Sequence, residues 1–144
     1  MIADLVNLSE HDADVVGKGK PFYCQLMCEV AWIFLPLDVF STPMFYLACQ
    51  SCRRKVVDAG NCYECAHCTK TFEDALPIFN FSVLITDCSG SIRVQCFGEV
   101  GEAVLGMTGV QFYRAYHENM ASMQELRSLR LFTPLSVTVK AKLD

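Results

Sequence analysis

Two Cys-x-x-Cys pairs are the residues of this sequence whose types and spacing could do chemistry. The first pair is Cys49 and Cys52, the second is Cys65 and Cys68, and twelve residues separate the two pairs. Each pair can fold as a tight turn that directs both sulfur atoms toward one centre. Four thiolates at tetrahedral geometry are the ligands of a closed structural zinc site, and the gap lies close to the spacing of zinc ribbons. The sequence therefore predicts a structural zinc ion held by these four cysteines.

Two alternatives to this site remain open on the sequence alone. The pairs could act as redox-active dithiols or form two disulfides, or Cys62 or His67 could replace one of the four ligands. Four thiolates leave no open position for water or substrate, so a metal held by them would stabilise the fold and take no part in a reaction. A ribbon this short has almost no apolar core, so metal binding must supply much of its folding free energy.

Enzymatic chemistry has little support elsewhere in the chain. No His, Asp or Glu residues cluster near a candidate nucleophile, and the sequence lacks the His-x-Glu that a zinc nucleobase deaminase carries ahead of Pro-Cys-x-x-Cys. His67 lies inside the second cysteine pair and His117 on an expected helix, where each is interpreted as structural or solvated. We therefore predict a protein that is not an enzyme.

The composition is that of one folded domain spanning residues 1–144. Hydrophobic residues make up 52% of the chain and charged residues 19%, which is enough apolar side chain for a core. Nine cysteines arranged as a metal site plus buried thiols favour a reducing compartment, the nucleus or the cytosol. The apolar run at residues 30–37 is too short to span a membrane. A net charge of −4 does not favour a large nucleic-acid interface, although it permits a local basic groove.

Period-two alternation predicts that the chain is mainly β-structure. Residues 78–87 and 92–97 are expected to form a hairpin, and residues 135–143 a last strand. Residues 22–37 predict a first strand, in which Trp32 is interpreted as a core residue and not as a platform for stacked bases. The buried face of that strand is expected to carry Cys24, Leu26, Cys28, Val30, Trp32 and Phe34.

Helices and a basic segment complete the expected elements. Residues 99–105 predict a short helix ended by Gly106, and residues 111–129 a second helix with an apolar stripe. Residues 53–55 are basic and precede a turn at residues 58–61, which predicts a small hairpin with a basic tip. This tip is either a solvated ribbon surface or a contact for phosphates.

Four segments resemble the C-terminal OB-fold domain of the large subunit of replication protein A. They are Tyr46-x-Ala48-Cys49, Cys52-Arg53-Arg54-Lys55-Val56, Tyr63-x-Cys65-x-x-Cys68, and Val94-Gln95-Cys96-Phe97 running into Glu102-Ala103-Val104-Leu105-Gly106. The resemblance covers residues 5–143. It implies an OB-fold barrel with short helices and with a zinc ribbon, at about residues 45–74, inserted between the first two strands. It also implies a nuclear module that binds single-stranded DNA and assembles complexes in replication, recombination or repair.

The sequence departs from that family in three ways. Residues 73–78 lack the basic and aromatic side chains that relatives carry after the ribbon, and the overall charge is acidic. The last barrel strand and the trimerisation helix expected beyond residues 139–141 are not evident. These departures favour a specialised relative, similar to the meiosis-specific OB protein, the large shieldin subunit or another repair or telomere paralogue.

Two functions follow as expectations. The first is binding of single-stranded DNA, and its candidate contacts are Arg53, Arg54, Lys55, Tyr63, Phe72, Arg93 and Gln95. The alternative is a docking platform for protein subunits of a replication protein A-like complex, with little direct DNA contact and no membrane association. An uncovered apolar helix stripe and an open barrel edge would serve that second role. The docking residues would be Tyr113, Tyr116, Met120 and Met123.

Overall fold

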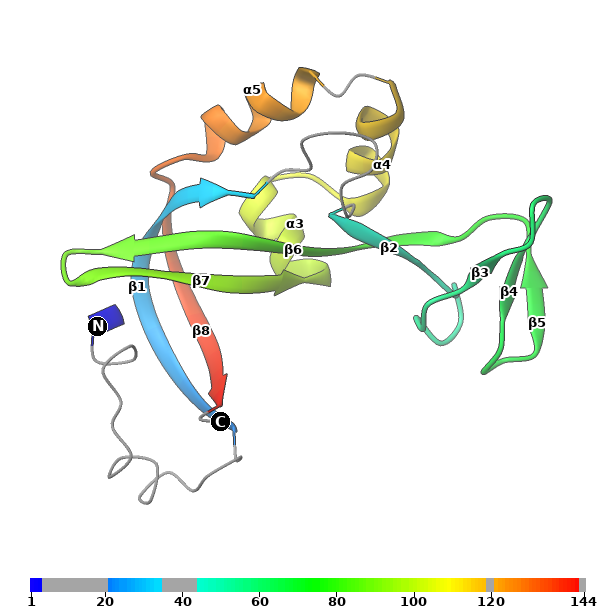
Figure 1. Cartoon of the computed structure of the whole chain (residues 1–144), viewed down its shortest axis with the longest axis horizontal. Coiled ribbons are helices and arrows are strands. Elements are labelled where there is room, and N and C mark those ends of the chain that lie inside the picture. The colour runs from blue at the N-terminus through cyan, green and yellow to red at the C-terminus, as the bar shows by residue number, and fades with distance from the viewer. Residues whose placement is uncertain (4–20, 35–43, 119–120, 143–144) are drawn as a thin grey trace. The chain divides into compact units, whose positions relative to one another are not determined.

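The computed structural model describes residues 1–3, 21–34, 44–118 and 121–142 (Figure 1). The chain divides into two compact units. One unit comprises Met1–Phe34, Ser82–Val94 and Arg130–Asp144, and the other comprises Leu35–Phe81 and Gln95–Leu129. The elements are mainly strands, as the alternation predicts. In the part of the chain that the structure describes, no helix is long and apolar enough to cross a membrane.

The first unit is built around β1 (Pro21–Ile33), which pairs antiparallel with two other strands. Along one edge it pairs with β8 (Pro134–Lys142), from Pro21 opposite Lys142 to Glu29 opposite Pro134. Along the other edge it pairs with the second half of β6 (Leu76–Asp87), from Glu29 opposite Thr86 to Ile33 opposite Val83. The next strand, β7 (Gly90–Phe97), returns beside β6 after a tight turn. The predicted hairpin and the predicted last strand are therefore confirmed.

A β-bulge near the end of β1 overturns the prediction for Trp32. Val30 lies opposite Ile85 and Trp32 lies opposite Leu84, so Ala31 is an extra residue without an opposite partner. A one-residue insertion moves every following side chain to the other face of the sheet. Ile33 is therefore fully buried, whereas Trp32 is 40% exposed and Phe34 is 36% exposed. The interpretation of Trp32 and Phe34 as core residues is wrong.

The second unit contains β2 (Phe45–Ala48), paired antiparallel with the first half of β6, and a small sheet of three strands. The order in that sheet is β3 (Val57–Asp58), β4 (Tyr63–Cys65) and β5 (Lys70–Phe72), all antiparallel. Its helices are α3 (Gly98–Leu105), α4 (Gly109–Glu118) and most of α5 (Ala121–Arg130). The single helix expected at residues 111–129 is therefore two helices, and Met120 lies outside the described residues.

Aromatic rings from β6 and α4 form the core of the second unit. Phe79 and Phe112 are both buried and meet edge to face, with ring centroids 5.2 Å apart. Helix α3 packs directly over β6, because a Cβ atom at Gly101 would lie 2.6 Å from the Phe79 Cβ. Gly106 ends α3 in the left-handed conformation, with φ 73°, and donates its backbone N–H to the carbonyl of Glu102. The predicted short helix and its glycine stop are confirmed.

Candidate metal centre and nucleic-acid contacts

The first cysteine pair folds as a tight turn, or knuckle, at the end of β2. The backbone N–H of Arg53 donates to the carbonyl of Cys49 at 2.9 Å, and the N–H of Cys49 donates to the carbonyl of Arg54 at 2.8 Å. The N–H of Ser51 points at the Cys49 Sγ, 3.4 Å away. Arg53 takes a left-handed conformation with φ 60° to close the turn. Together these bonds fix the direction of both thiols.

The second cysteine pair repeats this geometry after β4. The backbone N–H of Thr69 donates to the carbonyl of Cys65 at 2.9 Å, and the N–H of Cys68 points at the Cys65 Sγ at 3.4 Å. Thr69 has φ 54° and occupies the position that Arg53 has in the first knuckle. Both Cys-x-x-Cys pairs therefore act as the predicted pair of matching turns, although neither has glycine at its left-handed residue.

The four sulfur atoms of the two knuckles converge on one point. All lie within 4.8 Å of one another, with 3.9 Å between Cys49 and Cys68 and 3.5 Å between Cys52 and Cys65. Tetrahedral zinc with Zn–S bonds of about 2.3 Å places its ligand sulfurs about 3.8 Å apart, whereas a disulfide needs about 2.05 Å. The residues present therefore fit a metal ion better than a pair of disulfides. This cluster of four could hold a metal ion.

Neither alternative ligand belongs to this cluster. Cys62 is half-buried, and its carbonyl accepts the N–H of Ala59 at 2.9 Å to close the turn between β3 and β4. His67 is exposed in the second knuckle. The buried thiols of Cys28 and Cys96 lie in the strands, and burial raises the pKa of Cys28 and raises that of Cys96 to about 11. Both thiols are therefore protonated, as expected for small core residues; Cys24, predicted with Cys28, is half-buried.

The pKa values of two knuckle thiols, Cys49 and Cys68, shift in opposite directions. A hydrogen bond from the backbone of Cys52 lowers the pKa of Cys49 to about 6. Hydrogen bonding to Cys52, followed by burial, raises the pKa of Cys68 to about 12. A metal must displace the thiol protons to bind thiolates, so metal affinity at this site depends on pH.

Two aromatic side chains of the ribbon, Tyr63 and Phe72, pack against the metal-binding residues. They lie opposite each other on β4 and β5, and both contact the buried cluster of Cys49, Val56 and Cys65. The pKa of Tyr63 is raised, first by burial and then by neighbours that include Tyr113, with which its side chain hydrogen-bonds. Both side chains are half-buried and therefore contribute to the packing of the ribbon.

The three basic residues of the ribbon are exposed but do not form its tip. Arg53, Arg54 and Lys55 leave the first knuckle and reach β3. The tip is instead the turn after Asp58, whose carboxylate accepts the N–H of Gly60 at 2.8 Å. The turn lies at the predicted residues 58–61, but the basic residues precede β3 and are separated from the turn by that strand, so the prediction of a basic tip is wrong. Arg53 also lines a pocket of about 230 Å³ together with Glu99 and Glu102.

Arg93 and Gln95 point outward from β7, as their strand parity predicts. Val94 is half-buried and Cys96 is buried, whereas Arg93 and Gln95 are exposed. The guanidinium carbon of Arg93 lies 4.0 Å above the ring centroid of Phe34. The Nε2 of Gln95 donates to the Oδ1 of Asn80 on β6. Gln95 belongs to the same unit as the ribbon candidates, and Arg93 belongs to the other unit.

The stripe on α4 is partly covered within its own unit. The rings of Tyr113 and Tyr116 meet Phe45 edge to face at 5.2 Å and 5.4 Å. Both tyrosines are half-buried, and the buried residues of the helix are Gly109 and Phe112. Sequence reasoning did not include Phe112 in the stripe, although it lies one turn before Tyr116. The docking role of this stripe stays a prediction.

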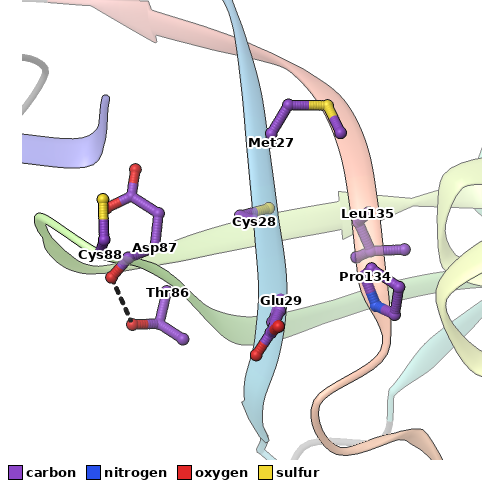
Figure 2. Close-up of a pocket in the computed structure, with 8 residues that line it drawn as sticks. All are labelled: Met27, Cys28, Glu29, Thr86, Asp87, Cys88, Pro134 and Leu135. Atoms are coloured by element: carbon purple, nitrogen blue, oxygen red, sulfur yellow. Dashed lines mark hydrogen bonds between the residues drawn. The ribbon is translucent and has the colours of Figure 1, made fainter.

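The acidic turn between β6 and β7 lies where the predicted hairpin places it, but sequence reasoning did not single out Asp87 as the residue that holds it. The carboxylate of Asp87 accepts backbone N–H bonds from Ile2 at 2.8 Å and from Ser89 at 2.7 Å. Hydrogen bonds from the Ser89 hydroxyl and from backbone N–H groups lower the pKa of Asp87 to about 2. Asp87 also lines an open groove of about 540 Å³ along β1, shown in Figure 2. The Asp-Cys-Ser-Gly order of residues 87–90 was the available signal for such a turn.

Comparisons of this chain with a family model and with curated proteins point to the same family. The family model described as "Replication factor-A C terminal domain" matches residues 23–144. The chain is 34% identical over 136 residues to a replication protein A 70 kDa DNA-binding subunit of Drosophila melanogaster, covering 89% of this chain and 21% of that protein. It is 35% identical over 71 residues to the corresponding subunit of Tetrahymena thermophila, covering 49% of this chain and 11% of that protein. The chain spans about a fifth or less of these relatives.

Solved structures show the same fold at lower sequence identity. A replication protein A heterotrimer bound to single-stranded DNA matches with a TM-score of 0.75 and 20% identity, over 92% of this chain and 31% of that one. Yeast replication protein A bound to single-stranded DNA matches with a TM-score of 0.65 and 14% identity, over 99% and 83%. The expected OB-type, mainly β fold is therefore confirmed. With the family model matched from residue 23 to residue 144, this chain belongs to the replication factor-A C-terminal domain family.

Proposed function

We propose that this chain is a single-stranded DNA-binding module of a replication protein A-like complex and that it is not an enzyme. The observation that carries the proposal is the family match across residues 23–144. The relatives are named as DNA-binding subunits, and the structures of similar fold are described as bound to single-stranded DNA. The module would comprise residues 1–144 as one OB-fold domain, with its ribbon at about residues 45–74. Work on single-stranded DNA in replication, recombination or repair would place it in the nucleus.

Exposed cations and polar groups would supply the DNA contacts. Arg93 and Gln95 lie on the solvent-facing side of β7, and OB-folds bind oligonucleotides on the corresponding sheet face. Arg53, Arg54 and Lys55 offer positive charge at the exit of the first knuckle, suited to phosphates. Tyr63 and Phe72 support the ribbon by packing, so their part in binding would be indirect.

The metal in the cysteine cluster would be zinc with a structural role. Closed zinc sites use four thiolate ligands on two matched turns, and the sulfur separations of 3.9 Å and 3.5 Å lie near the value of about 3.8 Å for tetrahedral zinc. The ligands would be Cys49, Cys52, Cys65 and Cys68, and the metal would fix the two knuckles in place of a larger apolar core. No step of a reaction is needed at this site.

The direct test is a fluorescence anisotropy titration of the zinc-loaded full chain. Labelled oligo(dT), a labelled duplex of the same length and several salt concentrations would be compared. The proposal expects tighter binding to the single strand and a fall in affinity as salt rises, because contacts to phosphates release counterions. Equal affinity for both DNA forms, or no binding at low salt, would contradict it.

A second candidate function is docking of protein subunits with little direct DNA contact. The description of one similar structure as a heterotrimer favours it, and so do the acidic net charge of −4 and the half-exposed rings of Tyr113 and Tyr116. Met120 and Met123 are the other residues predicted for that surface, and their side chains lie outside the described part of the structure. Co-purification of a nuclear partner at a one-to-one ratio, together with absent DNA binding, would select this function over the first.

A further inference from the structure

We propose that Trp32 and Phe34, turned outward by the β-bulge, form with Arg93 a stacking platform for an unpaired base of single-stranded nucleic acid. This inference rests on the proposed function and names the residues of the first unit that would contact the bases. The carrying observation is that the bulge at Ala31 places two large rings on the solvent face of a paired strand.

The two rings are held on one face by regular strand pairing. Trp32 lies opposite Leu84, and the N–H of Phe34 donates to the carbonyl of Ser82 at 3.2 Å, so pairing with β6 continues past Trp32. Residues two apart on a strand share a face and lie about 6.6 Å apart. The two side chains therefore leave the same face of a paired strand, at 40% and 36% exposure.

Arg93 gives this pair of rings a positive charge. Its guanidinium carbon lies 4.0 Å above the Phe34 ring centroid, within the range of a cation–π contact. A stacked guanidinium has its position set by the ring, while its N–H groups remain able to donate to a phosphate or a base edge. Stacking rings next to a cation are the combination by which proteins bind single strands without reading sequence.

The surrounding side chains favour a nucleic acid over an apolar protein partner. Beside the rings and Leu84, the outer positions of this part of β6 and β7 carry Ser82, Thr86 and Ser91, and the Ser91 hydroxyl donates to the Thr86 Oγ1 at 3.0 Å. Two rings interrupted by a cation and hydroxyl groups do not make a continuous apolar patch. They match a flat base with a charged backbone beside it.

The test uses the fact that Trp32 is the single tryptophan of the chain. The zinc-loaded full chain would be titrated with unlabelled oligo(dT) while tryptophan emission is followed, and with labelled oligo(dT) while anisotropy is followed. Stacking of a base on Trp32 should quench its emission along the same saturation curve that anisotropy reports. Trp32→Ala should raise the Kd about 5- to 150-fold, the range expected for one stacked base. Trp32→Phe should recover most of that loss because it keeps a ring.

Tyr23→Ala is the matched control. Tyr23 is an exposed aromatic residue on the same strand, at 66% exposure, and it lies opposite Lys140 beyond the stretch that pairs with β6. Its replacement should leave the Kd unchanged. Thermal unfolding of each variant shows whether a weaker complex reflects lost folding. If Trp32→Ala does not fold, the emission titration of the parent chain carries the test, because Trp32 is its single tryptophan.

The outcomes separate this inference from the proposed function. Binding by anisotropy with unquenched emission, and with Trp32→Ala as tight as the parent chain, would overturn the platform while DNA binding stands. No binding by anisotropy at low salt would overturn the proposed function and the platform with it.

Discussion

The guanidinium carbon of Arg93 lies 4.0 Å above the ring centroid of Phe34. A side chain on β7 and a side chain at the end of β1 therefore meet on the outer face of the sheet, with β6 paired to both strands. This contact depends on the bulge at Ala31, because without it Phe34 would point to the opposite face. A surface suited to stacking is thus a consequence of one inserted residue.

Replacing Arg93 should weaken binding to single strands in a way that separates stacking from charge. Arg93→Lys keeps the charge but loses the planar contact, so we expect a Kd a few-fold higher, about 0.5–1 kcal/mol, with the salt dependence unchanged. Arg93→Ala should also lower the slope of log K against log salt by about 1. Anisotropy at four or more salt concentrations measures both effects. A lysine variant with the parent's affinity would argue against the stacked geometry.

Reversing charge at the first knuckle tests the ribbon's part in binding. Arg53→Glu together with Arg54→Glu should weaken single-strand binding and flatten its salt dependence, since fewer phosphate contacts release fewer counterions. Lys70→Glu, at an exposed position after the second knuckle, is the control for a general loss of positive charge. If the double variant and the control bind alike, the segment is an ordinary solvated surface.

Removing one cysteine ligand should remove the metal. Cys68→Ser should lower zinc content from one equivalent to well below one and release the ribbon, because apparent zinc-binding energies of about 10–16 kcal/mol in small zinc modules are also their folding energies. Elemental analysis and proteolysis of the ribbon measure the two effects. Cys88→Ser, at an exposed cysteine outside the cluster, should retain zinc. Metal-free, well-folded parent protein would refute the assignment.

The acidic turn predicts a dependence of stability on low pH. Hydrogen bonds depress the folded pKa of Asp87 to about 2 from an ordinary 3.8, so its contribution to folding is present above about pH 4 and is lost as pH falls through 2. Asp87→Ala should therefore destabilise the chain at neutral pH and much less at pH 2. Chemical unfolding of both proteins across pH 2–7 gives the difference at each pH, and a difference that does not shrink toward pH 2 would refute this role.

Gly101 is a packing constraint that a methyl group should violate. Its absent Cβ would lie 2.6 Å from the Phe79 Cβ and 2.8 Å from the Phe81 Cε1. Overpacking costs about 1–3 kcal/mol, which exceeds the gain of about 1 kcal/mol in helix propensity from Gly to Ala. Gly101→Ala should therefore lower the free energy of unfolding. Val100→Ala, at an exposed position of the same helix, should change it little, and a stabilised Gly101→Ala protein would contradict this packing.

The sequence predicts a feature correctly where that feature is set by residues close together in the chain. The cysteine knuckles, the alternation of residues 78–87 and the glycine stop at Gly106 are set by neighbours in sequence, and the structure has all three. The bulge at Ala31 carries no glycine or proline signal, because it arises from the register between β1 and β6. The burial of Ile2 depends in the same way on a distant partner, Asp87. Alternation alone therefore placed Trp32 on the wrong face.

Arg53, the left-handed residue of the first knuckle, belongs both to the metal-binding turn and to the basic segment of the ribbon. The backbone N–H of Arg53 closes the turn that positions Cys49 and Cys52. The position of the Arg53 side chain therefore depends on the same turn as the two thiols. If an anion binds Arg53 more tightly when the metal ion holds the turn closed, then by thermodynamic reciprocity the bound anion must raise the affinity of the four cysteines for that ion. The affinity for the ion, measured by equilibrium competition with a chelator, would then report on occupancy of the basic segment.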